Sequence, residues 1–158
     1  MRSKGFTLIE LIVVLIVIGV LAVTAAPRFL DIEGDARRAS LEAFEGAFIA
    51  AEAVVSAEVM IEGLEDHKGV SIVNGVTILD GYIDLTVENL NNMMVTDGYT
   101  VVEPNAQSQM KTLYVFPKGI TYNKEVRTRR CAIVISRSTS SGGAKYGKTN
   151  TTLVDSEC

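Results

Sequence analysis

The sequence is poor in the residues that build metal and nucleophile sites. Its 158 residues include one histidine and two cysteines. A structural zinc site takes four ligands, so His67 with two distant cysteines does not predict one. A G-x-S-x-G motif, a phosphate-binding loop and a paired-carboxylate pattern are also absent. We therefore expect no enzyme activity, no cofactor and no metal, and we expect His67 to be solvated.

The charge of the chain is mildly acidic, with a formal net charge of −4. Such a balance gives no general reason to expect nucleic-acid binding. One basic cluster stands out against it, at Lys124, Arg127, Arg129 and Arg130. The cluster has three interpretations: a site for DNA or another anionic surface, a solvated strand, or a charge contact to a neighbouring subunit.

Charge is almost missing from the N-terminal segment, where Glu10 is the single charged residue between Phe6 and Ala26. Arg2 and Lys4 precede this run, which predicts a cytoplasmic N-terminus and translocation of the rest of the chain. Residues 11–26 would span about 24 Å as a helix, short of a bilayer core of about 30 Å. Adding residues 6–10 reaches the full thickness and places Glu10 near the cytoplasmic interface. A cleaved signal peptide and a plain signal anchor are the alternatives.

The stretch KGFTLIELIVV, residues 4–14, resembles the leader and mature start of type IV pilins. VTAAPRFLD at residues 23–31 and DAR at residues 35–37 look like the mannose-sensitive hemagglutinin subgroup of that family. The resemblance implies a leader of residues 1–5, which a prepilin peptidase removes between Gly5 and Phe6 before it N-methylates Phe6. It also implies that Glu10 meets the N-terminal amine of a neighbouring subunit.

A function follows from this resemblance as an expectation. The chain would be a structural subunit that polymerises through its N-terminal helix into a surface fibre for adhesion. Its expected partners are other copies, the prepilin peptidase, the inner-membrane assembly machinery, membrane lipid before assembly, and host or environmental surfaces. It would pass from the inner membrane to an extracellular pilus. The alternatives are a type II secretion pseudopilin or minor pilin, and a membrane-anchored enzyme or binding module.

The apolar spacing predicts one long helix from about Phe6 to Met60, ending near Gly63. We expect residues 6–28 to protrude as the transmembrane and assembly helix, with a kink around Gly19 and Pro27. Residues 29–158 would form the globular head. In the head, the helix should pack one apolar stripe on a sheet. The residues of that stripe are Phe29, Ile32, Ala36, Ala39, Ala43, Ala47, Ala50 and Val54, broadened by Leu41, Phe44, Phe48, Ala51 and Val55.

Strand patterns fill the remainder, which predicts an α+β, pilin-like fold with an antiparallel β-sheet. VSIV and VTIL flank Asn74-Gly75, a strong short-range hairpin signal. NLNNMMVTDG indicates a short helix or loop. TVVEP, TLYVFP, CAIVIS and TTLVDS are the other expected strands, and a Ser/Gly-rich loop lies between Arg137 and Asn150.

The two cysteines, Cys131 and Cys158, suggest a cross-link and an oxidising compartment, because a thiol at the last residue has little core to enter. If residues 131–136 and 153–158 pair with the cysteines opposite each other, Ser136 faces Leu153. The pilin resemblance implies a C-terminal disulfide that encloses a surface region, here residues 131–158, whereas the major secretion pseudopilins lack a terminal pair. Two free thiols are the alternative.

Overall fold

The structure is a computed structural model that describes residues 6–104, 111–120, 131–137, 149–156 and 158; for residues 26–31 it describes the helical backbone alone. The chain divides into two compact units, Met1–Ala36 and Arg37–Cys158, the second of which we call the C-terminal unit. Helix α1, Leu8–Ile61, contributes to both. Its bounds lie within two residues of those expected, and it includes Gly19 and Pro27. The kink expected there stays a prediction.

A glycine ends α1 where the sequence indicated. Gly63 has a left-handed φ of 68°. Glycine adopts this conformation at little energetic cost because it has no β-carbon. The Leu64 N–H donates to the Val59 carbonyl at 2.9 Å, and the Gly63 N–H donates to the Met60 carbonyl at 3.1 Å. These two bonds form a Schellman motif, in which otherwise unpaired carbonyls of the last turn are satisfied.

The first sheet is three-stranded, with β1 (Val70–Val73), β2 (Val76–Leu79) and β3 (Tyr82–Ile83) in that order. The predicted hairpin is confirmed: Asn74 and Gly75 have φ values of 48° and 80°, as a type I′ turn requires. Strand β3 was not predicted. Asp80-Gly81, with φ values of 51° and 82°, makes a second turn of this type, and an Asp-Gly pair is a signal for it.

The second sheet is four-stranded and antiparallel, in the order β4-β5-β6-β7. The strands are β4 (Tyr99–Val102), β5 (Lys111–Pro117), β6 (Ala132–Arg137) and β7 (Asn150–Val154). Each includes most of an expected strand. The short helix α2, Val87–Met93, precedes β4, and the Thr86 side chain caps it by accepting from the Asn89 N–H.

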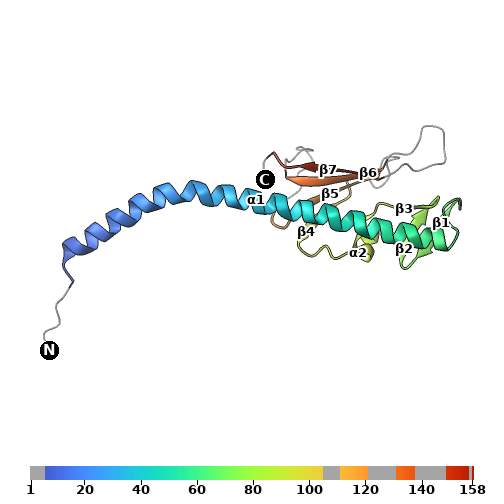
Figure 1. Cartoon of the computed structure of the whole chain (residues 1–158), viewed down its shortest axis with the longest axis horizontal. Helices are drawn as coiled ribbons and strands as arrows, with labels where there is room; N and C mark the ends of the chain where they lie inside the picture. The colour runs from blue at the N-terminus through green and yellow to red at the C-terminus, as the bar shows by residue number, and fades with distance from the viewer. Residues whose placement is uncertain (1–5, 105–110, 121–130, 138–148, 157) are drawn as a thin grey trace, which may run out of the picture. The chain divides into compact units, whose positions relative to one another are not determined.

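The second half of α1 runs alongside the sheets (Figure 1), and two apolar clusters join it to them. Leu41, Phe44 and Phe48 pack with side chains of the four-stranded sheet, among them Leu113, Val115, Ile133 and Ile135. Val55 and Val59 pack with the inner face of the three-stranded sheet, at Val73, Val76, Ile78 and Ile83. The expected α+β class, with a long N-terminal helix whose second half packs on antiparallel sheets, is confirmed.

The expected stripe of α1 was wrong in one respect. Its large members Leu41, Phe44 and Phe48 are buried, but its alanine-rich members, such as Ala43, Ala47 and Ala50, are exposed, and Val54 is 60% exposed. The two sets lie on adjacent faces of the helix, and apolar periodicity alone does not separate them. The side chains that fill more core volume face the sheets.

The expected register of the last two strands was also wrong. Ser136 lies opposite Asn150, not Leu153, and Ile133 lies opposite Leu153. Cys131 and Cys158 are nevertheless disulfide-bonded, with their Cα atoms 4.6 Å apart. The chain reaches the bond by turning after β7, where the Cys158 N–H donates to the Asp155 carbonyl at 3.2 Å. The assumption that the two cysteines face each other as ladder partners caused the three-residue error.

Candidate functional site

Two polar residues, Thr7 and Glu10, lie at the start of α1. The Thr7 carbonyl accepts from the Glu10 N–H at 3.1 Å and from the Leu11 N–H at 3.4 Å. The Thr7 hydroxyl donates to Glu10 Oε2 at 3.4 Å. A carboxylate in the first turn is favoured by the helix dipole and by the unpaired N–H groups there. The helix end therefore positions Glu10 one turn after Phe6, which is 78% exposed.

The helix that follows is apolar on every side. Leu8–Ala25 has a mean hydropathy of 3.0 and no part of it is buried. Its 18 residues span about 27 Å, close to the thickness of a bilayer core. Its one polar hydroxyl in the last turn, on Thr24, donates to the Leu21 carbonyl at 2.9 Å and so stays within the helix. By length and composition, this helix can cross a membrane.

The second half of α1 presents an unusual surface. Between Ala43 and Ile61 every exposed residue is uncharged. These residues form what we call the uncharged face of α1: Ala43, Gly46, Ala47, Ile49, Ala50, Ala53, Val54, Ala57, Met60 and Ile61. The glutamates of this stretch, Glu45, Glu52 and Glu58, are half-buried instead. A helix on a protein surface normally turns its charged face to water, and a contiguous exposed apolar patch marks an interaction site.

The half-buried glutamates hold the C-terminal strands to α1. Glu45 accepts a hydrogen bond from the Thr151 hydroxyl of β7. Arg38, two turns earlier, pairs with Asp155 at 3.2 Å and with Glu42 at 3.0 Å. Glu52 accepts from Arg137 Nη2 at 2.9 Å and from the Thr149 hydroxyl. The seven-residue spacing of 38, 45 and 52 places the three side chains on one face of the helix.

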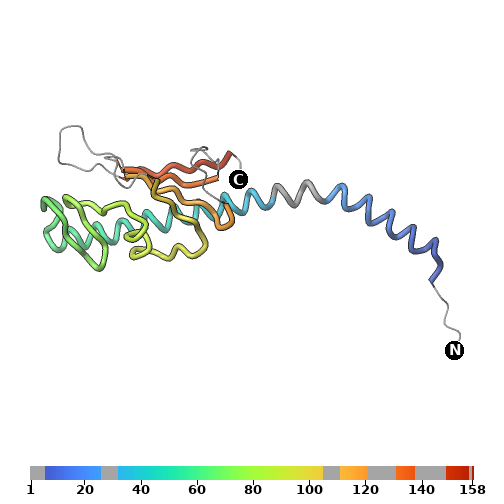
Figure 2. The backbone as a smooth tube through the Cα atoms, turned by 180° about the vertical axis from the view of Figure 1, so that it is seen from behind, coloured from blue at the N-terminus to red at the C-terminus, as the bar shows by residue number. Residues whose placement is uncertain are grey.

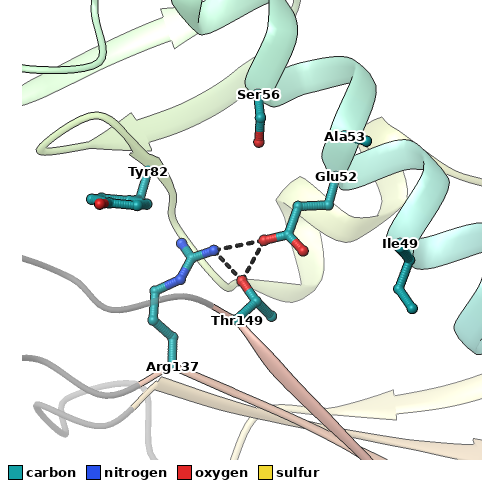
Figure 3. Close-up of a pocket in the computed structure, with 7 residues that line it drawn as sticks. All are labelled: Ile49, Glu52, Ala53, Ser56, Tyr82, Arg137 and Thr149. Carbon is teal, nitrogen blue, oxygen red and sulfur yellow. Dashed lines mark hydrogen bonds and ion pairs between the residues drawn. The ribbon is translucent and has the colours of Figure 1, made fainter.

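A cavity of about 340 Å³ opens at the last of these contacts, lined by Ile49, Glu52, Ala53, Ser56, Tyr82, Arg137 and Thr149 (Figure 3). Arg137 is 3% exposed and also donates to the Ile83 carbonyl, with its guanidinium 5.6 Å from the centre of the Tyr82 ring. Burial holds the pKa of Arg137 below its ordinary value, and the charge of the neighbouring Glu52 offsets only part of this lowering. Arginine stays charged at any physiological pH, so Arg137 contributes to the cavity a cation paired with Glu52 and cannot act there as a base.

The other residues singled out from the sequence divide as follows. Phe6 and Glu10 lie in the described chain, as do Gly19 and Pro27, but the roles predicted for them are not tested. Gly5 and the basic cluster at 124–130 lie outside the described residues. His67 is exposed, with Nδ1 3.5 Å from the Ser71 hydroxyl. Within the described ranges, no group of three metal-ligating side chains occurs.

Sequence reasoning missed several residues that matter here. Thr7 carries a recognisable signal, since a threonine before an apolar helical run indicates a helix start. Glu52, Arg137 and Thr149 carry none, because their contacts join positions far apart in the sequence. Glu52 in particular resembles any solvated glutamate of an amphipathic helix.

Comparisons with known proteins bear on the N-terminal part of the chain. The family model described as the prokaryotic N-terminal methylation motif matches residues 1–26. The type IV narrow pilus major component PilA5 of Thermus thermophilus is 43% identical over 58 residues, which are 37% of this chain and 50% of that protein. The match thus spans about half the length of that relative. No solved structure matches the chain. Both matches support the resemblance to type IV pilins, and the mannose-sensitive hemagglutinin subgroup stays a prediction.

Proposed function

We propose that the chain is a structural subunit of a type IV pilus, which polymerises through its N-terminal helix into a surface fibre for adhesion. One observation carries the proposal: the exposed apolar helix Leu8–Ala25 has Glu10 in its first turn, and both lie within residues 1–26, which match the methylation motif. The pilus relative is named a major component, which supports a structural role for this chain rather than a catalytic one.

Processing would create the partner of Glu10. We propose that a prepilin peptidase removes residues 1–5 by cutting between Gly5 and Phe6, and then methylates Phe6. A free α-amino group has a pKa of about 7.7–8.0 and is largely cationic at neutral pH. A carboxylate that enters an apolar bundle unpaired is costly, and pairing with that amine relieves the cost. Glu10 of one copy would therefore recruit the Phe6 amine of the next.

Two surfaces of α1 support burial against other copies. No part of Leu8–Ala25 is buried by the rest of the described chain, so membrane lipid would surround this helix in the inner membrane before assembly. The uncharged face of α1 is a second apolar surface, which lies within the C-terminal unit. Its alanines and Gly46 permit close helix approach, as small residues do at helix–helix contacts in membranes. Charge at its centre, as in Ala50→Glu, should block polymerisation while the subunit still folds.

The terminal disulfide favours the pilin over the type II secretion pseudopilin. The deciding experiment is electron microscopy of sheared surface fibres, with peptide identification and intact mass of the subunit. We expect fibres made of a chain that begins at methylated Phe6. A mature chain that begins at Met1 or after Ala26 would contradict the processing, and absence of the chain from any fibre would contradict the structural role.

A further inference from the structure

The tip of the β1–β2 hairpin carries a chemically labile pair, Asn74-Gly75. Figure 2 shows this hairpin, drawn in green, at the end of the C-terminal unit where α1 also ends. Asn74 and Gly75 are exposed, although the residues on either side, Val73 and Val76, are buried. Within the described residues, neither the Asn74 side-chain amide nor the Gly75 N–H makes a hydrogen bond. Asparagine is a thermolabile residue, and Asn74 is the one asparagine of the sequence that glycine follows.

We propose that Asn74 deamidates spontaneously, so that the C-terminal unit gains an aspartate or a β-linked isoaspartate at this turn. The Gly75 backbone nitrogen attacks Asn74 Cγ, and the new N–C bond closes a cyclic imide. The bond from Cγ to Nδ2 breaks, and the amide nitrogen leaves as ammonia with the proton of the Gly75 N–H. Water then opens the imide at either of its carbonyl carbons. Glycine obstructs this attack least, because no side chain shields its nitrogen.

The Asp80-Gly81 turn has the same backbone type and could form the same imide with loss of water, but contacts hold it closed. The Asp80 carboxylate accepts from the Gly69 N–H at 2.8 Å. Gly81 packs so closely on the chain before β1 that a β-carbon built on it would collide with the Glu65 carbonyl oxygen. No comparable contact holds the Asn74 side chain within the described part of the chain. Of two similar turns, the structure therefore leaves the one at Asn74 open to reaction.

One side-chain contact restrains the Asn74-Gly75 turn from outside. Asn92 of α2 donates from Nδ2 to the Gly75 carbonyl at 2.7 Å. Attack on Asn74 Cγ requires the Asn74 backbone to rotate out of its left-handed conformation, so the reaction proceeds from a transient opening of the hairpin tip. A hydrogen bond of average net strength lowers the population of the opened turn about fivefold. Asn92 is therefore a positioning residue that slows the deamidation.

The isoaspartate product loosens the hairpin. It places the side-chain Cβ in the main chain and so lengthens the turn between Val73 and Val76, which face each other in the register. The length of a hairpin loop fixes the register of its strands. These two valines belong to the cluster that packs on Val55 and Val59 of α1. Ageing of the chain should thus weaken the contact between the three-stranded sheet and α1, whether or not copies have polymerised.

The first test follows the full chain in detergent micelles during incubation in a mildly alkaline buffer, with peptide mass spectrometry and labelling by an isoaspartate methyltransferase. We expect the mass gain of an amide-to-acid change at Asn74 before Asn91 or Asn150, and isoaspartate at residue 74 but not at Asp80. A free peptide with the sequence of residues 70–79 gives the rate without the fold and should react faster. If Asn74 stays intact while the free peptide reacts, or if Asn91 or Asn150 reacts first, the proposal is overturned.

The second test removes the restraint on the turn. Asn92→Ala should raise the deamidation rate of Asn74 about fivefold, because the opened turn becomes more populated. The matched control is Asn91→Ala, which removes the neighbouring amide of α2. That amide accepts from the Thr96 hydroxyl and does not contact the turn, so the rate should not change. Equal rates in wild type and Asn92→Ala would overturn the restraining role of Asn92.

A third measurement separates the added charge from the longer backbone. Freshly purified Asn74→Asp carries the charge on a normal backbone, whereas the isoaspartate fraction of aged protein carries both changes. We expect hydrogen exchange of the β1 and β2 amides to be faster in the isoaspartate fraction than in Asn74→Asp. Equal exchange in the two would overturn the loosening of the hairpin.

Discussion

Arg137 Nη2 lies 2.9 Å from Glu52 Oε1, although 85 residues separate the two in the sequence. The same guanidinium donates to the Ile83 carbonyl and to the Thr149 hydroxyl. Four segments thus meet at one side chain: α1, β3, the end of β6 and the approach to β7. Because Arg137 is 3% exposed, its charge depends on these partners in place of water.

Removal of Glu52 should therefore destabilise the C-terminal unit. Glu52→Ala leaves the buried guanidinium without a counter-charge, and breaking such a pair costs about 3–5 kcal/mol of the free energy of unfolding. The measurement is urea unfolding of the full chain in detergent micelles. Glu45→Ala is the matched control, since it removes a glutamate of the same helix face that contacts a hydroxyl and not a buried cation.

A double variant tests whether the charge itself is the cause. Glu52→Leu/Arg137→Met replaces the pair by apolar side chains, which is often close to neutral for stability. We expect it to be more stable than Glu52→Ala. If Glu52→Ala unfolds at the wild-type urea midpoint, the ion pair contributes little and the four segments are joined by other contacts.

Asn89 bonds the backbone of β2 at Thr77, next to the two β2 residues that pair with β3. Its side chain accepts from the Thr77 N–H at 2.9 Å, donates to the Thr77 carbonyl at 3.1 Å and donates to the Asp84 carbonyl at 2.7 Å. The residue is 3% exposed. We expect Asn89→Ala to lower the free energy of unfolding by about 1–3 kcal/mol, because it leaves the Thr77 N–H unpaired. The Thr77 and Asp84 carbonyls still accept from the Asp84 and Thr86 N–H groups.

Asn89→Asp gives this prediction a pH signature. A carboxylate in place of the amide faces two carbonyl oxygens, which raises its pKa above the ordinary value of about 3.9. When the pKa of a carboxyl group is raised in the folded state, the protonated group favours folding at low pH. This contribution to stability is lost as the pH rises through the folded-state pKa. The deficit relative to wild type should therefore be larger at pH 7 than at pH 4. A deficit that does not change with pH would show that the amide donors are dispensable.

Elements with local signals could be predicted from the sequence, and contacts between distant positions could not. The period of α1, its end near Gly63 and the Asn74-Gly75 turn are local, and each is confirmed. The Asp80-Gly81 turn was equally local and was overlooked. The partition of α1 between a core face and an exposed face depends on which side chains fill the volume against two sheets, and a helical period does not contain that information.

The candidate site shows the same division. Glu10 stands out because a charge interrupts an apolar run, so its position could be singled out without a structure. Glu52 and Arg137 look like ordinary surface charges until the fold brings them together. The pairing of Cys131 with Cys158 followed from their number, but the register did not, because a turn after β7 adds residues that no strand pattern reveals.

The disulfide should stabilise the C-terminal strand. Cys131 and Cys158 are 27 residues apart, and the loop-entropy relation gives about 3.6 kcal/mol for a ring of this size, an upper figure because unfolded chains keep some structure. Cys158→Ser is the cleaner variant, since Cys131 is buried and a serine there adds a desolvation cost. We expect a lower urea midpoint and new protease cleavage within residues 151–156.

Two observations would contradict this view of the C-terminus. Reduction of the wild-type chain should reproduce the Cys158→Ser midpoint, so a reduced protein with the oxidised midpoint would show that the ring contributes nothing. Cleavage confined to other segments would show that Arg38–Asp155 and Glu45–Thr151 hold β7 without the bond.

Glu10 should act in assembly and not in membrane insertion. Glu10→Ala removes a charge that is costly in lipid, so the subunit should stay in the membrane fraction. Loss of one partner of a close charge pair costs about 2 kcal/mol or more, which corresponds to roughly thirtyfold weaker association. Fibre yield should fall accordingly, as measured by shearing and immunoblotting against the membrane pool.

Glu10→Gln separates charge from shape. The amide can still accept from the Thr7 hydroxyl, as Glu10 Oε2 does in the first turn of α1, but it carries no charge for a neighbouring Phe6 amine. We expect it to assemble as poorly as Glu10→Ala, whereas Thr7→Val, which keeps the charge, should assemble better than both. Normal fibres from Glu10→Gln would assign the role to the side-chain hydrogen bond. A subunit missing from the membrane fraction would place the action of Glu10 before assembly, at insertion or leader cleavage.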